Sequence, residues 1–132
     1  MALVVVAEDE DDIRSLVVRM LHRAGHEVIA AADGAVALEG VRENRPDAVI
    51  SDLDLPRMSG VELCRAIRTD ANTADLPVIL VSGSLLPGDP RAVEARATAI
   101  LAKPFLPQEL VACLDKALAA GHDDGVPPLT CP

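Results

Sequence analysis

Short apolar runs alternate along the chain with segments in which apolar residues recur every three or four positions. The first run, LVVVA at residues 3–7, is followed by apolar residues at helical spacing, among them Ile13, Val17 and Leu21. A run of this length is typical of a strand buried on both faces, and the spacing after it predicts an amphipathic helix. Gly25 then suits the left-handed position that often ends a helix.

The same alternation continues to the end of the patterned region. Further strands are predicted at EVIAA (27–31), AVIS (48–51), LPVILVS (76–82) and TAILA (98–102), and further helices after Asp33, Ser59, Asp89 and Leu106. Ser59 and Glu62 have the spacing of a capping box, which marks the third helix. Five strands that alternate with five helices predict right-handed crossovers and the α/β fold class: a doubly wound, five-stranded parallel sheet covered on both faces.

The fourth predicted helix, DPRAVEARA at residues 89–97, has a weak apolar face. It consists of little more than Ala92, Val93 and Ala97. Few contacts would hold this helix, so we expect its opening to be easy and the helix to be a candidate moving element. The pattern is equally compatible with a short helix that has no such role.

Composition and charge narrow the function classes. The chain has 132 residues, of which 50% are hydrophobic, and a single Phe, so we expect one domain with an aliphatic core. Twelve Lys and Arg against 21 Asp and Glu give a net charge of -9, which argues against direct nucleic-acid binding. The apolar runs are far shorter than the ~20 residues of a membrane helix. We therefore expect no membrane association and a cytoplasmic location.

The cysteines and histidines show no metal-binding spacing. Cys64, Cys113 and Cys131 are odd in number, and we interpret all three as reduced thiols. His22, His26 and His122 are scattered, which is typical of solvated surface residues.

The end of the chain differs from the rest in composition. GHDDGVPPLTCP is polar, rich in Gly and Pro, and lacks helical or strand patterning. It predicts a domain at residues 1–120, followed by a flexible tail or linker at 121–132.

Polar side chains follow four of the predicted strands. The acids of EDED (8–11) follow the first strand, Asp52 ends the third, Ser82 ends the fourth and Lys103 follows the fifth. Ligands of such sheets bind at the carboxyl ends of the strands. Each residue alone also has a structural explanation, as a helix-dipole partner or a turn residue. Their joint position at one edge favours a functional site.

Crowded carboxylates need a cation, and Mg²⁺ suits a few carboxylates with positions left for water and phosphate oxygens. Lys103 would supply a second positive charge, and the Ser82 hydroxyl could donate to a phosphoryl oxygen. A carboxylate in this setting can act as a nucleophile, which predicts an aspartyl phosphate at Asp52. The backbone carbonyl of Asp54, two residues further on, could ligate the metal.

Four segments together resemble the receiver domain of two-component response regulators over residues 3 to about 119. They are VVVAEDEDDIR, PDAVISDLDLPRMSGVEL, PVILVSGS and AKPF. The resemblance implies the flavodoxin-like strand order 2-1-3-4-5. It also implies that Asp52 accepts a phosphoryl group from the phosphohistidine of a sensor histidine kinase or phosphotransfer protein. The chain would be a signalling switch that catalyses only its own phosphorylation and dephosphorylation.

The remaining roles are also implied by the resemblance. Asp9 would ligate Mg²⁺ directly, Glu8 would act largely through a metal-bound water, and the Asp54 carbonyl would complete the protein ligands. Lys103 would pair with the phosphoryl group, through a Lys103–Pro104 peptide that is typically cis, and Ser82 would move toward the phosphoryl group. The surface of the fourth helix, fifth strand and fifth helix would receive a downstream protein partner, an output domain or a second copy in a homodimer. The chain would be either a stand-alone receiver or part of a longer regulator.

Three residues depart from the family pattern. Ile100 occupies the position, three residues before Lys103, where the family usually has a switch aromatic. Asp54 adds a carboxylate where the family more often has an uncharged residue. Ser84 is small and should leave the phosphoryl group open to water. Of the three, it is Ile100 that puts the usual aromatic-gated switch in doubt.

Two other functions remain open at this point. DLD at residues 52–54 matches the core motif of aspartate-nucleophile phosphatases of the haloacid dehalogenase type, although that motif normally follows the first strand. A pseudo-receiver that uses the fold as a binding scaffold without phosphate is the other alternative. The intact acids, Ser82 and Lys103 argue against the scaffold, whereas Ile100 and Asp54 leave it open.

Overall fold

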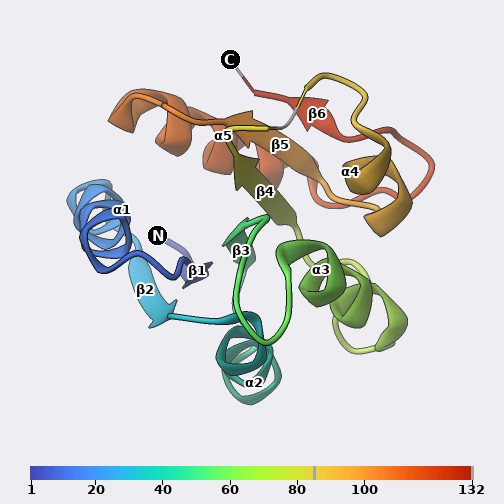
Figure 1. Ribbon diagram of the computed structural model, residues 1–132, viewed down its shortest axis with the longest axis horizontal. Helices are drawn as coiled ribbons and strands as arrows, with labels where there is room; N and C mark the ends of the chain where they lie inside the picture. Colours follow the sequence, from blue (N-terminus) through green and yellow to red (C-terminus); the bar gives the residue numbers. More distant parts are fainter. Residues whose placement is uncertain (85, 132) are drawn as a thin grey trace.

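Strands and helices alternate from Leu3 onward (Figure 1), and the computed structural model describes residues 1–84 and 86–131. The strands are β1 (Leu3–Ala7), β2 (Glu27–Ala31), β3 (Ala48–Asp52), β4 (Val78–Ser82), β5 (Ala99–Ala102) and β6 (Leu129–Thr130). The helices are α1 (Asp11–Arg23), α2 (Gly34–Asn44), α3 (Gly60–Thr69), α4 (Pro90–Ala95) and α5 (Pro107–Ala120). No helix within this described part is long and apolar enough to cross a membrane.

The sheet is parallel throughout, with the strand order β2-β1-β3-β4-β5-β6 among the described residues. The predicted doubly wound α/β fold and the order 2-1-3-4-5 are confirmed. β1 lies between β2 and β3, so the strand order reverses there. The segments that leave the carboxyl ends of β1 and β3 therefore lead to helices on opposite faces of the sheet. This divergence opens a site between the two strand ends.

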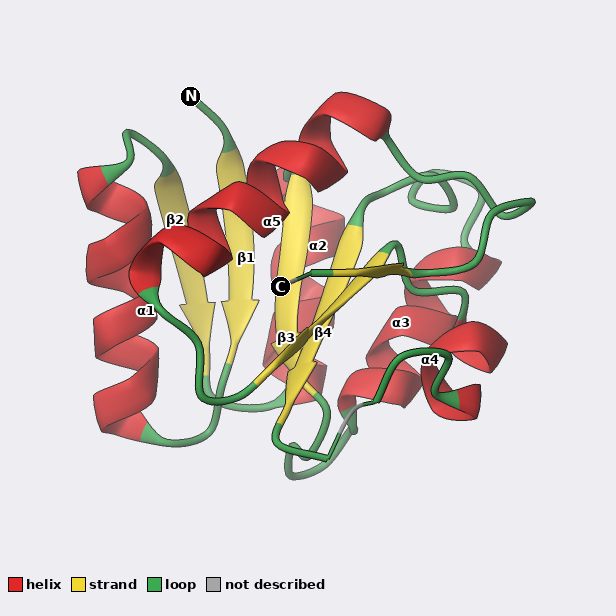
Figure 2. Ribbon diagram, turned by 90° about the horizontal axis from the view of Figure 1, so that it is seen from above, coloured by secondary structure: helices red, strands yellow, loops and turns green. Residues whose placement is uncertain are grey.

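Two apolar layers cover the sheet (Figure 2). α1 and α5 pack on one face through Val17, Leu21, Leu110 and Leu114, whereas α2, α3 and α4 pack on the other. Strand residues alternate between the layers: Val4 and Val6 of β1 face α1 and α5, and Val5 and Ala7 face α2 and α3. This alternation explains why each strand reads as a continuous apolar run, because both of its faces are buried.

Local signals in the sequence define the starts of α2 and α3. The Asp33 side chain accepts a hydrogen bond from Val36 N at 2.9 Å. Ser59 and Glu62 form the predicted capping box, in which Ser59 Oγ accepts from Glu62 N and Glu62 Oε1 accepts from Ser59 N. Each cap satisfies backbone groups that the first turn leaves unpaired.

α4 is shorter than predicted, because the chain leaves the helix at Arg96 in a left-handed conformation with φ of 60°. Ala92 and Ala95 form its buried side, whereas Val93 is 48% exposed. The prediction that Val93 belongs to the apolar face is wrong. With 6 residues and two buried alanines, α4 has little to hold it against β5.

The interpretation of all three cysteines as reduced thiols is wrong. Cys113 of α5 and Cys131, just after β6, form a disulfide, and Cys64 is a buried free thiol. The expectation that residues 121–132 contain no strand is also wrong, because β6 pairs with β5. Pro132 lies outside the described residues. No local pattern indicated the pairing, because 18 positions separate the two cysteines and the segment after α5 must reverse the chain direction before they meet.

Two of the three histidines differ from the predicted solvated state. His26 is buried, and its Nδ1 accepts a hydrogen bond from Ala2 N at 3.0 Å. The His122 side chain is 2% exposed. His22 is exposed on the last turn of α1, as predicted.

Candidate functional site

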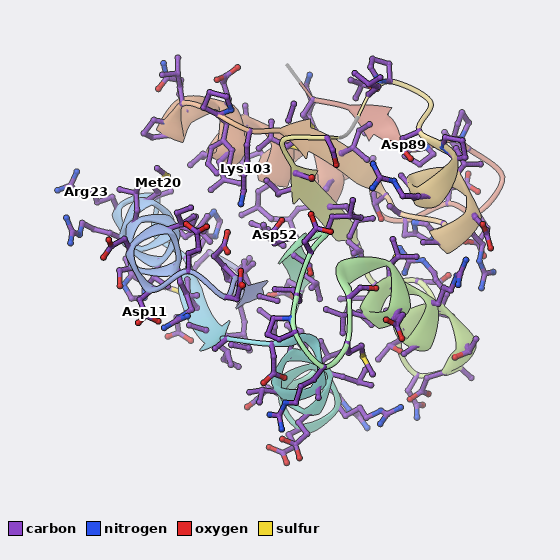
Figure 3. The ribbon with its side chains drawn as sticks, in the orientation of Figure 1. Asp11, Met20, Arg23, Asp52, Asp89 and Lys103 are labelled. Atoms are coloured by element: carbon purple, nitrogen blue, oxygen red, sulfur yellow. A yellow bond between two sulfur atoms is a disulfide. The ribbon has the colours of Figure 1, made fainter. Side chains whose placement is uncertain are left out.

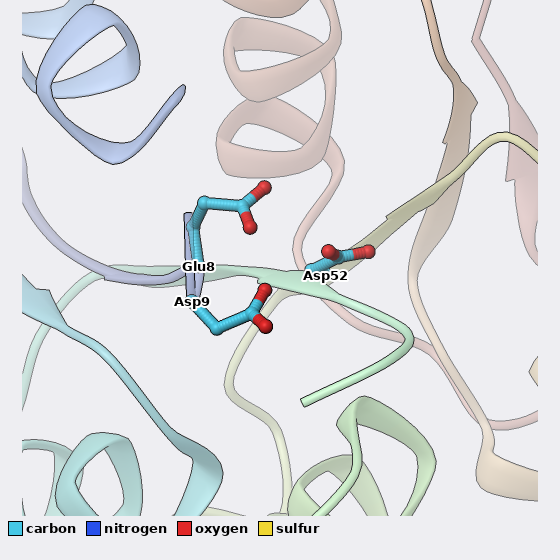
Figure 4. A group of neighbouring side chains, drawn as sticks. All are labelled: Glu8, Asp9 and Asp52. Carbon is cyan, nitrogen blue, oxygen red and sulfur yellow. The ribbon is translucent and has the colours of Figure 1, made fainter. Parts of the chain in front are cut away.

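Three carboxylates from two strand ends meet at the carboxyl edge of the sheet (Figure 4). Glu8 and Asp9 follow β1, and Asp52 ends β3. One oxygen of each carboxylate lies within 4.8 Å of the others. Glu8 is buried, Asp52 is partly buried and Asp9 is exposed, so the group opens to solvent on the side of Asp9.

The Asp52 carboxylate is held by the backbone amide of the next residue, Leu53, and by the ammonium of Lys103. Oδ1 accepts a hydrogen bond from Leu53 N at 2.8 Å, and Oδ2 lies 3.3 Å from Lys103 Nζ. Its side chain is 13% exposed. The carboxylate is therefore oriented from the protein side and still reachable from solvent.

Gly60 lets the first turn of α3 approach the backbone of Asp52. A Cβ at Gly60 would lie 2.2 Å from the Asp52 carbonyl oxygen and 3.0 Å from Leu53 Cα. Gly60 N also donates to Leu53 O at 2.9 Å. Because real Cβ atoms do not approach a carbonyl oxygen so closely, a side chain here would displace the segment that carries Asp52.

Lys103 joins the ends of β5, β1 and β3 (Figure 3). Nζ lies 2.9 Å from Glu8 Oε1 and 3.3 Å from Asp52 Oδ2. Burial lowers the pKa of the Lys103 ammonium, but the hydrogen bond to Glu8 and the charge of Asp52 outweigh burial and raise the pKa above its usual value. The ammonium is therefore a fixed positive charge beside the carboxylates. The Lys103–Pro104 peptide is cis, as the resemblance implied.

Ser82 ends β4 in a buried position and is bonded to the loop that follows. Its Oγ accepts a hydrogen bond from Ser84 N at 3.1 Å and lies 3.0 Å from Ser84 Oγ. Arg91 of α4 donates through Nη2 to the carbonyl and hydroxyl oxygens of Ser84, each at 3.3 Å. Arg91 was not among the predicted site residues, although its position two residues after the helix cap Asp89 was an available signal.

Asp54 and Ile100 lie apart from the carboxylate group. The Asp54 side chain is exposed, and the group found among the described residues comprises Glu8, Asp9 and Asp52 without it. The hydrogen bonds that Arg91 donates to Asp89 are the main cause that raises the pKa of Arg91, and the negative charge of Asp54 adds a smaller effect. Ile100 is 3% exposed and belongs to the core layer that includes Ala92 and Ala95 of α4.

The pocket beside Asp52 is small. It has a volume of about 20 Å³ and is lined by ten residues that include Glu8, Asp52, Lys103 and Phe105. Clefts that enclose drug-sized ligands usually measure about 300–1,000 Å³. This pocket can therefore admit a small group beside Asp52, but it is too small to enclose a whole organic molecule.

The fold and this edge define a doubly wound α/β domain with an aspartate-centred acidic site. The model of the response regulator receiver domain matches residues 4–115. The chain is 41% identical over 110 residues to the transcriptional regulatory protein PrrA of Mycobacterium tuberculosis, covering 83% of this chain and 46% of PrrA. It is 32% identical over 122 residues to the DNA-binding response regulator MtrA of Mycolicibacterium smegmatis, covering 92% of this chain and 52% of MtrA. The chain belongs to the response regulator receiver domain family, and it spans about half the length of these relatives.

Solved structures agree with this assignment. The chemotaxis response regulator CheY4 of Vibrio cholerae superimposes with a TM-score of 0.84 at 34% identity, covering 88% of this chain and 98% of that one. The receiver domain of sensor histidine kinase PA1611 from Pseudomonas aeruginosa, with a magnesium ion in its active site cleft, superimposes with a TM-score of 0.83 at 29% identity. This match covers 89% of this chain and 98% of that one. Each superposition covers at least 88% of this chain.

Proposed function

We propose that this receiver is a signalling switch in which Asp52 accepts a phosphoryl group from the phosphohistidine of a partner kinase or phosphotransfer protein. The observation that carries the proposal is the position of the Asp52 carboxylate, between a fixed ammonium and two further carboxylates at one sheet edge. In the transfer, the phosphorus–nitrogen bond of the donor breaks as Asp52 Oδ forms a bond to phosphorus. Such transfers depend on positioning and charge neutralisation more than on other covalent chemistry.

Glu8, Asp9 and Asp52 fit a divalent cation. Their oxygens approach within 4.8 Å of one another, and carboxylates at such distances repel unless a cation neutralises them. Hard oxygen ligands that leave one side open suit Mg²⁺. The backbone carbonyl of Asp54 is a further proposed ligand. When bound, Mg²⁺ would neutralise charge on the phosphoryl oxygens.

Lys103 and Ser82 are the proposed partners of the phosphoryl group. Lys103 already contacts Asp52 and would pair with a phosphoryl oxygen after transfer. Ser82 Oγ would have to leave its contacts with Ser84 in order to donate to the phosphoryl group. Because Ile100 replaces the usual aromatic and is packed in the core, we propose that the response to phosphate reaches α4 through Ser84 and Arg91.

The proposed partners are a sensor histidine kinase or phosphotransfer protein and a downstream protein or output domain. The relatives PrrA and MtrA bear the names of transcriptional and DNA-binding regulators, and this chain matches about half of each. For this chain itself, the net charge of -9 argues against direct contact with nucleic acid. We also propose a cytoplasmic location, where a kinase would meet it.

The phosphatase alternative is disfavoured by the site. A pocket of about 20 Å³ cannot enclose the organic part of a small phosphate ester. The exposed Asp54 side chain also lies outside the carboxylate group, where a general acid for the same reaction would be needed. A phosphohistidine presented on a protein surface does not need an enclosed chamber.

The test is intact-mass spectrometry after incubation with acetyl phosphate, with and without Mg²⁺. We expect one Mg²⁺-dependent phosphoryl adduct in the wild type and in Asp54→Asn, and none in Asp52→Asn. A protein that stays unmodified would be tested again with a phosphorylated kinase or phosphotransfer protein. Failure with both donors would contradict the proposal and favour a scaffold that does not use phosphate.

A further inference from the structure

The C-terminal segment, residues 121–131, covers the free edge of β5. Leu129 N donates to Thr98 O at 3.0 Å, and Cys131 N donates to Ile100 O at 2.9 Å. Figure 1 shows β6 beside β5, with the segment that leads to it passing α4. The backbone of Ile100, the residue at the switch position, is therefore covered by the protein's own chain rather than by a partner.

The segment is also tied to the neighbouring helix and strand by polar contacts. Asp124 pairs with Arg96, just after α4, at 3.2 Å. Thr98 Oγ1 accepts hydrogen bonds from Val78 N and Arg68 Nη2, which leaves its single hydrogen to donate to His122 Nδ1 at 2.8 Å. His122 therefore carries its proton on Nε2, which lies 2.6 Å from Asp124 Oδ1.

These non-covalent contacts are few for a segment of this length. β6 has 2 residues, Val126 is 51% exposed and Leu129 is 38% exposed. The ion pair between Arg96 and Asp124 is exposed on both sides, and such pairs contribute little. Ordering the backbone of ten or so residues has a large entropic cost. The covalent bond from Cys131 to Cys113, which is buried in the α5 layer, is the contact that closes the loop.

We propose that residues 121–131 form a redox-released cover: the disulfide holds the segment on β5, and reduction by a dithiol frees it. One thiolate of the dithiol attacks Sγ of Cys131, the more exposed cysteine at 6%, and Cys113 leaves as a thiolate that takes up a proton. The second thiol of the reductant then displaces Cys131, so two electrons and two protons pass to the protein. The reductant closes to its own disulfide.

The consequence of opening lies at the output side of the molecule. Release leaves the Thr98 and Ile100 carbonyls without their strand partner, and an uncovered strand edge accepts an extended segment of another chain. Cys64 does not compete for the pair, because burial raises the pKa of its thiol to about 11 and keeps it protonated. The cover is a feature beyond the phosphotransfer function and does not depend on it.

The test combines thiol counting with amide exchange on the whole chain. After oxidation with oxidised glutathione, alkylation of the denatured chain should give one adduct, at Cys64, and after dithiothreitol it should give three. The amides of Leu129 and Cys131 should exchange at least about tenfold faster in the reduced protein, while those of β1 and β3 stay unchanged. In Cys131→Ser, which has two thiols in place of three, the amide of Leu129 should exchange as fast as in the reduced wild type, with or without oxidised glutathione.

Two results would overturn the proposal. Three adducts after oxidation would mean that the disulfide does not form. Unchanged exchange at Leu129 in the reduced protein, or in Cys131→Ser, would mean that the segment stays on β5 without the bond. Neither measurement uses a phosphoryl donor or Asp52, so a failure of the phosphotransfer proposal would leave this result interpretable.

Discussion

Lys103 Nζ lies 2.9 Å from Glu8 Oε1, in an ion pair that joins residues 95 positions apart. The same ammonium lies 3.3 Å from Asp52 Oδ2. Lys103 is thus shared between an acid proposed to hold the metal and the acid proposed to accept phosphate. A phosphoryl group on Asp52 would compete with Glu8 for this ammonium.

Replacing Lys103 by Met should strengthen Mg²⁺ binding and lower the stability of the metal-free protein. The variant leaves Glu8 and Asp52 without their shared cation, so we expect the free energy of unfolding to fall by about 1–2 kcal/mol. The Kd for Mg²⁺ should fall about tenfold, because a divalent ion no longer meets a neighbouring positive charge. Calorimetric titration and chemical denaturation with and without Mg²⁺ measure both effects. Lys116→Met, at an exposed position of α5, is the control; equal Mg²⁺ affinity in the two variants would refute the prediction.

Gly60→Ala should disturb the proposed acceptor site from the first turn of α3. The added Cβ would lie 2.2 Å from the Asp52 carbonyl oxygen, so the backbone of Asp52 has to shift. We expect a stability loss of about 2–3 kcal/mol, as in other overpacked sites, together with slower phosphorylation by acetyl phosphate.

Gly83→Ala is the matched control, because a Cβ there meets nothing within 4 Å. Denaturation curves and intact-mass time courses of both variants give the comparison. A Gly60→Ala protein as stable and as reactive as Gly83→Ala would show that the segment holding Asp52 tolerates the displacement.

Arg68→Met should be strongly destabilising, although Arg68 is far from the acidic site. The buried guanidinium donates to the carbonyl oxygens of Arg96, Ala74 and Leu76 and to Thr98 Oγ1. Met keeps the apolar volume but leaves these acceptors unpaired. We expect a loss of about 2–4 kcal/mol in the free energy of unfolding.

Arg65→Met controls for the loss of a positive charge on the same helix. Arg65 pairs with Glu94 in solvent, so its removal should cost about 0.5 kcal/mol or less. Urea denaturation resolves the two variants. Similar losses for both would mean that the Arg68 contacts add little to the fold.

Asp89 should titrate with a midpoint near pH 2. The side-chain hydrogen bond from Arg91, followed by the bond from its backbone N–H, lowers the Asp89 pKa from 3.8 to about 2. Because the folded pKa lies below the unfolded one, the stabilisation is fully present above about pH 4 and is lost as the pH falls toward 2. Carboxyl carbon chemical shifts followed by NMR measure the midpoint. In Arg91→Gln the midpoint should rise toward about 4, and a midpoint unchanged by this substitution would exclude Arg91 as the cause.

Local signals made most of the fold predictable. Buried strands appear as apolar runs because both faces of a parallel sheet are covered. Asp33 and Ser59 mark the starts of their helices because each side chain binds the amide three residues further on. α4 was less predictable, because its end at Arg96 depends on a left-handed backbone that arginine does not signal.

The acidic site was predictable for a topological reason. Parallel strands place their carboxyl ends at one edge, so residues that follow β1, β3, β4 and β5 had to meet once the alternation of strands and helices was recognised. The distances within the site were not predictable. Whether Lys103 contacts Glu8 or Asp52, and whether Ser82 turns toward Ser84, depends on side-chain geometry at that edge.

The sequence by itself determined the order of elements, the layers of the sheet and the edge where the acids gather, because each follows from a short-range pattern or from chain topology. Only the tertiary structure decided that Cys113 meets Cys131, that β6 covers β5 and that His122 is buried against Thr98. These contacts join short segments across the C-terminal loop. They form because α5 and β5 place their residues within reach of the C-terminal segment, and not because of any local preference of the residues themselves.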